Sequence, residues 1–410
     1  MTKTPASSSE SSALLPANNG TPKPSVRTAV AFTANVSLAI LVLTILSVIS
    51  MRSMGLIIKF LLILFLLLGW AYSLLCLYGL YLWCRGEVPL TNSNKDVDGK
   101  YIVTTTASTN DRTIEYFVWG STKPNATVTV VCHGSNTTGK YFNQYLYPAK
   151  TMEAMNVKVI SPSYPGHGGS DAQPFRDITD WPKDDLEPIL LAEGVDTFMI
   201  QGSSYGTAHA MAAASYFSPD RCLAMGLNVP YLPENICREF DLHTDADYIL
   251  SESSLSHPWI LLPILSLLSL TYTQIAKGVG MIAEGPAAME QIPAVIRALE
   301  ADCRRSFLRG PIGQAYEMLN SSTNQQWPDP RDIQCQNVAI WYAEDDGACP
   351  PDHGEWLADV FTKKERKEKT CKTNIRHEKK GLGHFTYMDH ASRDQGIMTE
   401  TLLAMILDQQ

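Results

Sequence analysis

The chain has 410 residues, which is enough for one large domain with accessory segments. Its formal net charge of −9, together with the lack of a basic patch interleaved with aromatic residues, argues against nucleic acid as a partner. Nine cysteines are scattered along the chain without paired spacing, which favours reduced thiols over a disulfide framework or a metal site.

The N-terminal part divides into a polar tail and two apolar segments. Residues 1–28 are rich in Ser, Thr, Pro, Asn and Ala without apolar periodicity, which predicts a disordered tail. Residues 29–50 and 60–84 are uncharged runs of 22 and 25 residues, each long enough to cross a hydrocarbon core of about 30 Å. Both runs are too long for the apolar region of a signal peptide. We therefore expect residues 29–84 to form a two-span transmembrane hairpin in a lipid bilayer.

The basic residues around the hairpin predict its orientation. Six Lys or Arg residues flank it and two lie in its connecting loop, so the positive-inside rule places both flanks, and with them the domain that follows, on the cytosolic side. Glycosylation sequons at Asn125, Asn136 and Asn320 favour the opposite orientation, because a lumenal domain can be modified there. Asn136, however, lies in a loop to which we assign a role in the chemistry, where a glycan would obstruct the site.

From residue 101 onward, strand patterns alternate with helical ones. The runs at 101–106 and 112–118 alternate apolar and polar residues in part, as antiparallel edge strands do. Strands buried on both faces are predicted at 127–132, 157–161, 197–200, 222–228 and 337–342. Helical stretches such as 142–155 and 184–193 lie between most of them. This order predicts an α/β fold with a mostly parallel sheet and helices on both faces.

Residues 231–335 interrupt the alternation with about a hundred residues of helical character. This segment is predicted to be a cap inserted between two parts of the core, 100–230 and 336–410. Its most apolar piece, 259–270, has twelve residues and is too short to span a bilayer. We consider two interpretations of this piece. It is either a cap helix buried against the core, or the wall of an acyl-binding pocket or a surface that dips into the membrane.

One stretch concentrates the candidate chemistry. The apolar run at 197–200 leads into Gly-Ser-Ser-Tyr-Gly at residues 202–206, and an Ala-rich helical segment, 208–216, follows at once. Strand, Gly-x-Ser-x-Gly turn and helix are the parts of a nucleophile elbow, with Ser204 as the nucleophile. The next helix would place its N-terminus at Ser204, where developing negative charge is favoured. Ser203 is the second choice.

An acid and a base follow the elbow in chain order. The predicted strand 337–342 runs into a loop that offers Asp345 and Asp346, either of which could orient a histidine. His384 follows a Gly-x-Gly turn near the C-terminus and is the expected base. His390 and His377 are its alternatives. Two earlier histidines, His133 after the strand 127–132 and His167 in the Gly-rich loop 163–171, are expected to support their loops, because the base comes last in this order.

With these motifs in this order, residues 100–230 and 336–410 resemble the α/β-hydrolase fold superfamily, of the membrane-anchored kind with a serine nucleophile. The resemblance favours Asp346 over Asp345, because Asp346 lies at the usual spacing of four residues before Pro350. Two departures are Ala343, where glycine is common, and a basic run within 363–369 that lengthens the interval between acid and base.

The resemblance also implies an oxyanion hole and a reaction. The backbone N–H groups of Ser135 and Tyr205 would hold the oxyanion, and Ser204, His384 and Asp346 would form the triad. Water would cleave the acyl-enzyme, so no metal and no cofactor is expected. The anchor and the apolar cap favour a lipid-like small-molecule acyl substrate, an ester or thioester. A non-catalytic binding module with this fold is the alternative, although the intact triad argues against it.

Overall fold

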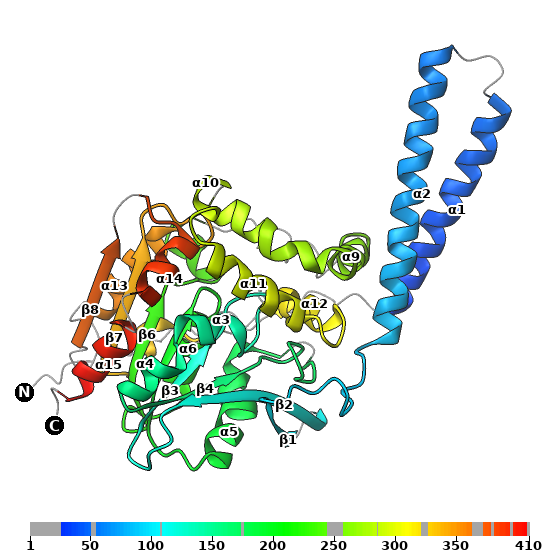
Figure 1. Ribbon diagram of the computed structural model, residues 1–410. Coiled ribbons are helices and arrows are strands. Elements are labelled where there is room, and N and C mark those ends of the chain that lie inside the picture. Colours follow the sequence, from blue (N-terminus) through cyan, green and yellow to red (C-terminus); the bar gives the residue numbers. More distant parts are fainter. Residues whose placement is uncertain are drawn as a thin grey trace, which may run out of the picture.

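The computed structural model describes residues 26–50, 55–106, 109–173, 176–243, 257–284, 286–320, 327–362, 372–378, 381–393 and 397–407. The predicted tail up to residue 25 and the basic run within 363–369 lie outside these ranges. Figure 1 shows an α/β domain from which two long helices project side by side.

The two projecting helices are α1 (Val26–Ser50) and α2 (Leu56–Arg85). Both are long and apolar enough to cross a membrane, and most of their large apolar side chains are exposed. Polar side chains meet between the helices, where the hydroxyl oxygens of Ser37 and Ser73 lie 2.7 Å apart. Apolar groups outside and paired polar groups inside suit a hydrocarbon environment, which offers polar groups no partner. The helices thus support the predicted hairpin by length and composition.

We expect the full-length chain to stay with the membrane pellet during alkaline carbonate extraction, because two uncharged spans cannot be left in water. A Leu64→Arg variant should stay there too, since a central charge costs only about 2.5–3.5 kcal/mol of insertion free energy. Immunoblotting of pellet and supernatant measures the distribution. Release of the full-length chain into the supernatant would show that the hairpin does not span.

The domain is built on one sheet with the strand order β1-β2-β4-β3-β5-β6-β7-β8. The strands are β1 (Lys100–Thr106), β2 (Thr109–Gly120), β3 (Thr127–Cys132), β4 (Val157–Pro162), β5 (Phe198–Ser203), β6 (Cys222–Asn228), β7 (Asn337–Ala343) and β8 (Lys372–Glu378). β2 pairs antiparallel with β1 and β4, and all other pairs are parallel. Every residue of β5 and β7 is buried, as expected for strands covered on both faces. The predicted mostly parallel sheet is confirmed.

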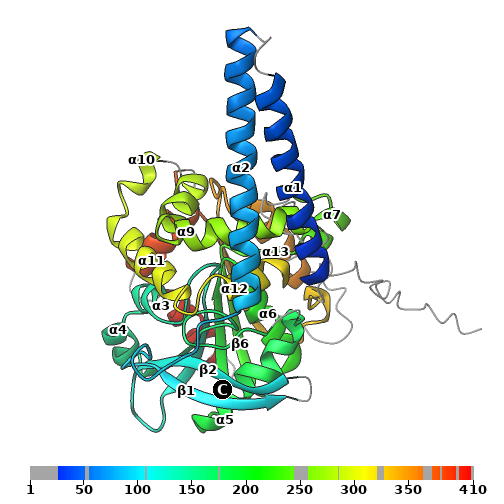
Figure 2. The ribbon, with the colours of Figure 1, turned by 90° about the vertical axis from the view of Figure 1, so that its right-hand side faces the viewer.

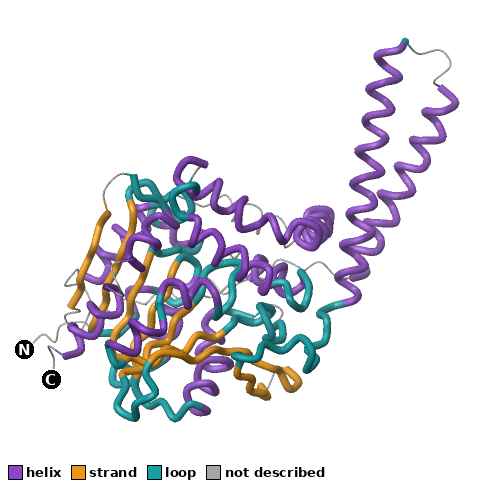
Figure 3. The backbone as a smooth tube through the Cα atoms, in the orientation of Figure 1, coloured by secondary structure: helices purple, strands orange, loops and turns teal. Residues whose placement is uncertain are grey.

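Helices cover both faces of the sheet (Figure 3). They are α3 (Tyr141–Leu146), α4 (Ala149–Ala154), α5 (Glu187–Ala192), α6 (Gly206–Tyr216), α13 (Pro351–Thr362), α14 (His384–Arg393) and α15 (Ile397–Leu407). One core cluster packs α5, α6 and α13 against one face, and a second packs α3, α4, α14 and α15 against the other. Because successive side chains of a strand point to opposite faces of the sheet, Val130 belongs to the first cluster and Val131 to the second.

The prediction of one helical stretch at 142–155 is wrong in one respect, because the structure has two helices there, α3 and α4. The break lies at Tyr147 and Pro148. A proline ring disfavours the helical conformation of the residue before it and removes one backbone donor. Pro148 therefore ends the first helix and precedes the second.

Between β6 and β7 the chain forms the helices of the cap. They are α7 (Glu234–Glu239), α9 (Pro258–Ala283), α10 (Pro286–Met289), α11 (Pro293–Ser306) and α12 (Ile312–Asn320), followed by the short turn η4 (Pro330–Asp332). The apolar piece 259–270 belongs to α9, a helix of 26 residues. Its segment 260–278 is long and apolar enough for a membrane span by length and composition. The prediction that this piece is too short to span a bilayer was therefore wrong about its length, because the apolar helix continues beyond residue 270.

Helix α9 packs across the end of α2 that is nearest the domain (Figure 2). The two backbones touch at Gly79, where an added Cβ atom would lie 2.0 Å from the carbonyl oxygen of Leu262. The Ser266 hydroxyl donates a hydrogen bond of 2.5 Å to the carbonyl oxygen of Leu75. Leu265 is fully buried in a cluster that includes a side chain of α2. The apolar tract of the cap thus packs on the anchor helix.

Candidate active site

The turn at Ser204 has the geometry of an elbow. Ser204 joins β5 to α6 with a φ of 55°, a strained conformation for a residue with a side chain. Glycine is required on both sides. A Cβ atom at Gly202 would lie 2.3 Å from the carbonyl oxygen of Gly206, and one at Gly206 would lie 2.4 Å from that of Cys132. The turn therefore presents Ser204, which is partly exposed, at the C-terminal edge of the sheet.

The neighbouring Ser203 is held inside the domain. Its side chain is buried, and its hydroxyl accepts a hydrogen bond of 3.3 Å from the amide of Asn228. Successive residues of a strand point to opposite sides, so the turn that exposes Ser204 leaves Ser203 in the sheet. This placement supports Ser204 as the nucleophile.

The predicted acid and base meet directly. Nδ1 of His384 lies 2.8 Å from Oδ2 of Asp346, and both side chains are buried. The other carboxylate oxygen accepts backbone N–H bonds of 2.8 Å each from Ala348 and Cys349. Cys349 also links this pair to the elbow, because its Sγ lies 3.9 Å from Oγ of Ser204. The loop after β7 and the start of α14 therefore converge beside the elbow.

Asp345 has a different place. Its carboxylate accepts a hydrogen bond from the backbone N–H of Gly381, and its own N–H donates 3.4 Å to the carbonyl oxygen of Leu382. Asp345 thus holds the backbone of the turn that precedes His384. The alternatives His377 and His390 lie in β8 and α14, with side chains outside the described set.

The predicted oxyanion loop passes next to the elbow. A Cβ atom at Gly134 would lie 3.5 Å from Cβ and 3.9 Å from Oγ of Ser204. Ser135 follows in an exposed turn, and Tyr205 is the N-cap residue of α6. Backbone N–H groups at a helix N-terminus and in a tight turn are the donors that an oxyanion requires. The structure brings these two segments together on either side of Ser204.

The buried side chain of His133 supports this loop through a contact with its backbone. Its Nδ1 lies 2.8 Å from the carbonyl oxygen of Gly134, while the backbone N–H of Tyr164 donates 3.1 Å to Nε2, so the proton is assigned to Nδ1. Burial, reinforced by the charge of His167, lowers the pKa of His133 well below its usual value. The ring stacks on Tyr164, which stacks in turn on His209, at centroid distances of 3.7 and 3.6 Å. His133 is therefore a neutral structural residue.

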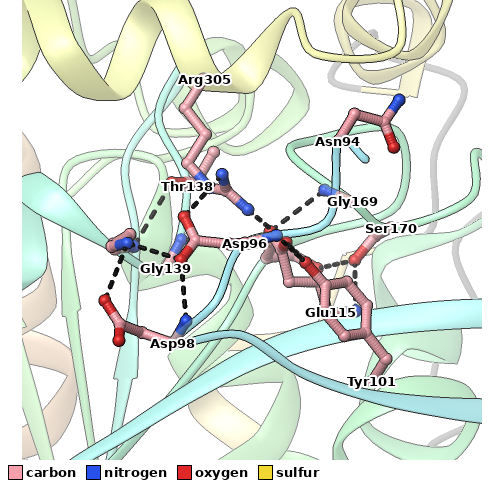
Figure 4. A network of polar contacts seen from close by, with 12 residues as sticks. Asn94, Asp96, Asp98, Tyr101, Glu115, Thr138, Gly139, Gly169, Ser170 and Arg305 are labelled. Carbon is pink, nitrogen blue, oxygen red and sulfur yellow. Dashed lines mark hydrogen bonds and ion pairs between the residues drawn. The ribbon is translucent and has the colours of Figure 1, made fainter. Parts of the chain in front are cut away.

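A buried carboxylate, Glu115 of β2, organises the Gly-rich loop (Figure 4). It accepts hydrogen bonds of 2.7 Å from the hydroxyl of Tyr101 and 3.0 Å from the backbone N–H of Gly169. Arg305 of α11 pairs with Glu115 and also with Asp96, at 2.9 Å from Nη1 to Oδ2. This network joins the segment after α2, the core and the cap.

The structure adds one cap residue, Asp302, to the surroundings of the candidate site, and no motif in the sequence points to it. Asp302 of α11 accepts hydrogen bonds from the Thr138 hydroxyl and, at 3.1 Å, from the backbone N–H of Phe142. Burial raises the pKa of Asp302 to about 6, although these hydrogen bonds act to lower it. Asp302 therefore ties the cap to the segment that leads from the oxyanion loop into α3. It lies about 160 residues from its partners, at a distance that no local pattern reveals.

Within the described ranges, no three His, Cys, Asp or Glu side chains converge as a metal site would require. None of the cysteines in those ranges forms a disulfide.

Comparisons with known proteins identify the fold. A family model described as the alpha/beta hydrolase fold matches residues 128–259, whereas no curated protein matches the chain by sequence. A thermophilic esterase from Thermogutta terrifontis is similar over 75% of this chain and 99% of its own, with a TM-score of 0.54 and 16% identity. A hydrolase from Pseudomonas aeruginosa covers the same shares at a TM-score of 0.55 and 14% identity. An esterase from Exiguobacterium antarcticum is similar over 73% of this chain and 98% of its own, with a TM-score of 0.54 and 14% identity. The predicted α/β-hydrolase fold is confirmed.

Proposed function

We propose that the chain is a membrane-anchored serine hydrolase that cleaves a lipid-like acyl ester or thioester through Ser204, His384 and Asp346. The observation that carries this proposal is the 2.8 Å contact between His384 and Asp346, linked by Cys349 to a strained, partly exposed serine. A nucleophile on a strained turn beside an acid–base pair is typical of a site of covalent catalysis. Esterases among the structures of similar fold support the same reaction class.

In this mechanism His384 removes the proton of Ser204, and the serine oxygen attacks the substrate carbonyl carbon. The N–H groups of Ser135 and Tyr205 hold the resulting oxyanion, and Asp346 stabilises the imidazolium. His384 then protonates the leaving alcohol or thiol. In the second half, His384 activates water, which attacks the acyl-enzyme and releases the carboxylic acid. Side chains and backbone N–H groups of the chain perform these steps, with water as the second reactant.

The position of α9 supports a lipid-like substrate. Helix α2 has 30 residues and is about 45 Å long, whereas a hydrocarbon core is about 30 Å thick. Its contact with α9, from Leu75 to Leu82, lies in the half of α2 nearest the domain. This contact falls at the membrane interface if the hydrocarbon core surrounds the residues of α2 before Leu75. Leu267 and Leu270 of α9 remain exposed there. A preference for short soluble esters over long-chain esters presented in a bilayer would contradict this part of the proposal.

We place the domain on the cytosolic face, as the basic flanks of the hairpin favour. A mobility shift of the cellular protein after N-glycosidase treatment would place it in a lumen instead.

The proposal predicts that a fluorophosphonate probe labels the folded protein covalently at Ser204, because the base activates that hydroxyl alone. Mass spectrometry of the labelled peptide should locate the adduct. Heat-unfolded protein should not react, and Ser203→Ala should react as the wild type does. Absence of labelling in folded protein would favour the alternative, a non-catalytic binding module with this fold.

A further inference from the structure

A carboxylate of the cap reaches the helix that begins with the proposed base. Glu284 follows the last residue of α9, and its Oε1 accepts the backbone N–H groups of Phe385 and, at 3.0 Å, of Thr386. Its Oε2 accepts a hydrogen bond of 2.9 Å from the Thr386 hydroxyl. These contacts surround the first turn of α14, at the residues directly after His384.

The first N–H groups of a helix have no partner within the helix and are satisfied by a cap. The residue before α14 is Gly383, which has no side-chain oxygen to act as that cap. A Cβ atom at Gly383 would lie 2.6 Å from Oε2 of Glu284, so the glycine leaves room for the carboxylate. Glu284 therefore supplies from the cap what a local N-cap residue supplies elsewhere. The negative charge of the Glu284 carboxylate also interacts favourably with the positive, N-terminal end of the α14 helix dipole.

We propose that Glu284 is a positioning residue for His384: by capping α14 from the cap domain, it holds the imidazole in line with Ser204. The inference rests on the proposed function, because it assigns the helix start a role in placing the base. The precision required is high, since a displacement of about 1 Å in a catalytic group can lower a rate about a hundredfold.

The charges around His384 define what a loss of Glu284 would change. Asp346 contacts the imidazole, Asp345 holds the preceding turn, and Asp389 on α14 accepts a hydrogen bond from the Tyr145 hydroxyl. Of the other elements packed against α14, α3 and β7 contain no charged residue. Helix α9 carries Lys277, which pairs with Glu300, and α15 carries the exposed Glu400. Glu284 is thus the carboxylate that the cap adds to those of the core beside this helix start.

The test compares Glu284→Ala and Glu284→Gln with a control on the same cap, Glu300→Gln. Glu300 of α11 is partly exposed and pairs with Lys277 of α9 at 3.7 Å. We expect Glu284→Ala to lower kcat roughly ten- to hundredfold with KM within about twofold, because the base is misplaced while the substrate contacts remain. Glu284→Gln keeps an amide oxygen for the N–H groups and should recover most of kcat. Rates are counted per folded protein, as measured by circular dichroism, because labelling by the fluorophosphonate itself depends on the base.

The Gln variant should also shift the pH profile. Catalysis needs neutral His384 and is lost as the pH falls through its pKa; a nearby negative charge favours the imidazolium and raises that pKa. Removing the charge should therefore move the acidic limb of kcat/KM about 0.2 to 0.7 pH units lower. NMR of histidine-labelled protein measures the same imidazole pKa without any turnover.

Unchanged kcat in Glu284→Ala together with an unchanged His384 pKa in Glu284→Gln would overturn the positioning role. Equal losses in Glu300→Gln would overturn it too, because they would reflect general loosening of the cap. Failure of the proposed function is a separate result. In that case Ser204→Ala would leave hydrolysis intact, and the imidazole pKa of His384 in Glu284→Gln would still test the positioning role of Glu284.

Discussion

Ser204→Ala is expected to lower kcat/KM for an acyl ester by about 10⁴- to 10⁶-fold while the protein keeps its fold. The substitution removes one oxygen from a partly exposed turn, and with it the weak contact of 3.9 Å to Sγ of Cys349. The same change also relieves no strain, because alanine must adopt the φ of 55° that serine adopts. Steady-state kinetics on a soluble ester, with circular dichroism as a check of folding, measure both effects.

The matched control is Ser203→Ala, which removes the same atom one residue earlier. Ser203 is buried and accepts its hydrogen bond from Asn228, so this change should cost a little stability and leave activity within a fewfold of wild type. Loss of hydrolysis in Ser203→Ala with retention in Ser204→Ala would move the nucleophile to residue 203 and refute the elbow as described.

Asp346→Asn should lower kcat by about 10⁴-fold, because an asparagine cannot stabilise the imidazolium and favours the wrong tautomer of His384. Combined with Ser204→Ala, it should add almost nothing, since members of a triad act as one unit. The measurement is a double-mutant cycle of kcat that includes both single variants.

Asp345→Asn is the control for that cycle, because its amide oxygen can still accept the hydrogen bond from Gly381. We expect it to retain most activity. If Asp345→Asn were as inactive as Asp346→Asn is expected to be, while Asp346→Asn were active, the acid would be Asp345 and the contact with His384 would serve structure alone.

The sequence predicted the fold class correctly because the signals were local. Alternating residues predicted the two antiparallel strands, although only β1 lies at the sheet edge, because β2 pairs with both β1 and β4. Short apolar runs predicted the buried parallel strands, and each of these signals depends on neighbours a few residues apart. Element bounds were less well determined. The pattern at 142–155 predicted one helix, whereas the structure has two helices that are separated at Pro148. The predicted apolar piece 259–270 ends before α9 does.

For the candidate site, chain order and motif spacing pointed to Ser204 and His384, and the family resemblance favoured Asp346 over Asp345. The strained turn needed only its two glycines to be recognised. Contacts between distant segments came from the tertiary structure. Asp346 and His384 are 38 residues apart, and Glu284 lies about a hundred residues from the helix that it caps. The sequence determined which groups are candidates for the chemistry, because that chemistry resides in single side chains and short turns. Only the folded chain decided which carboxylates contact them, because those contacts depend on long-range packing, within the core for Asp346 and between the cap and the core for Glu284.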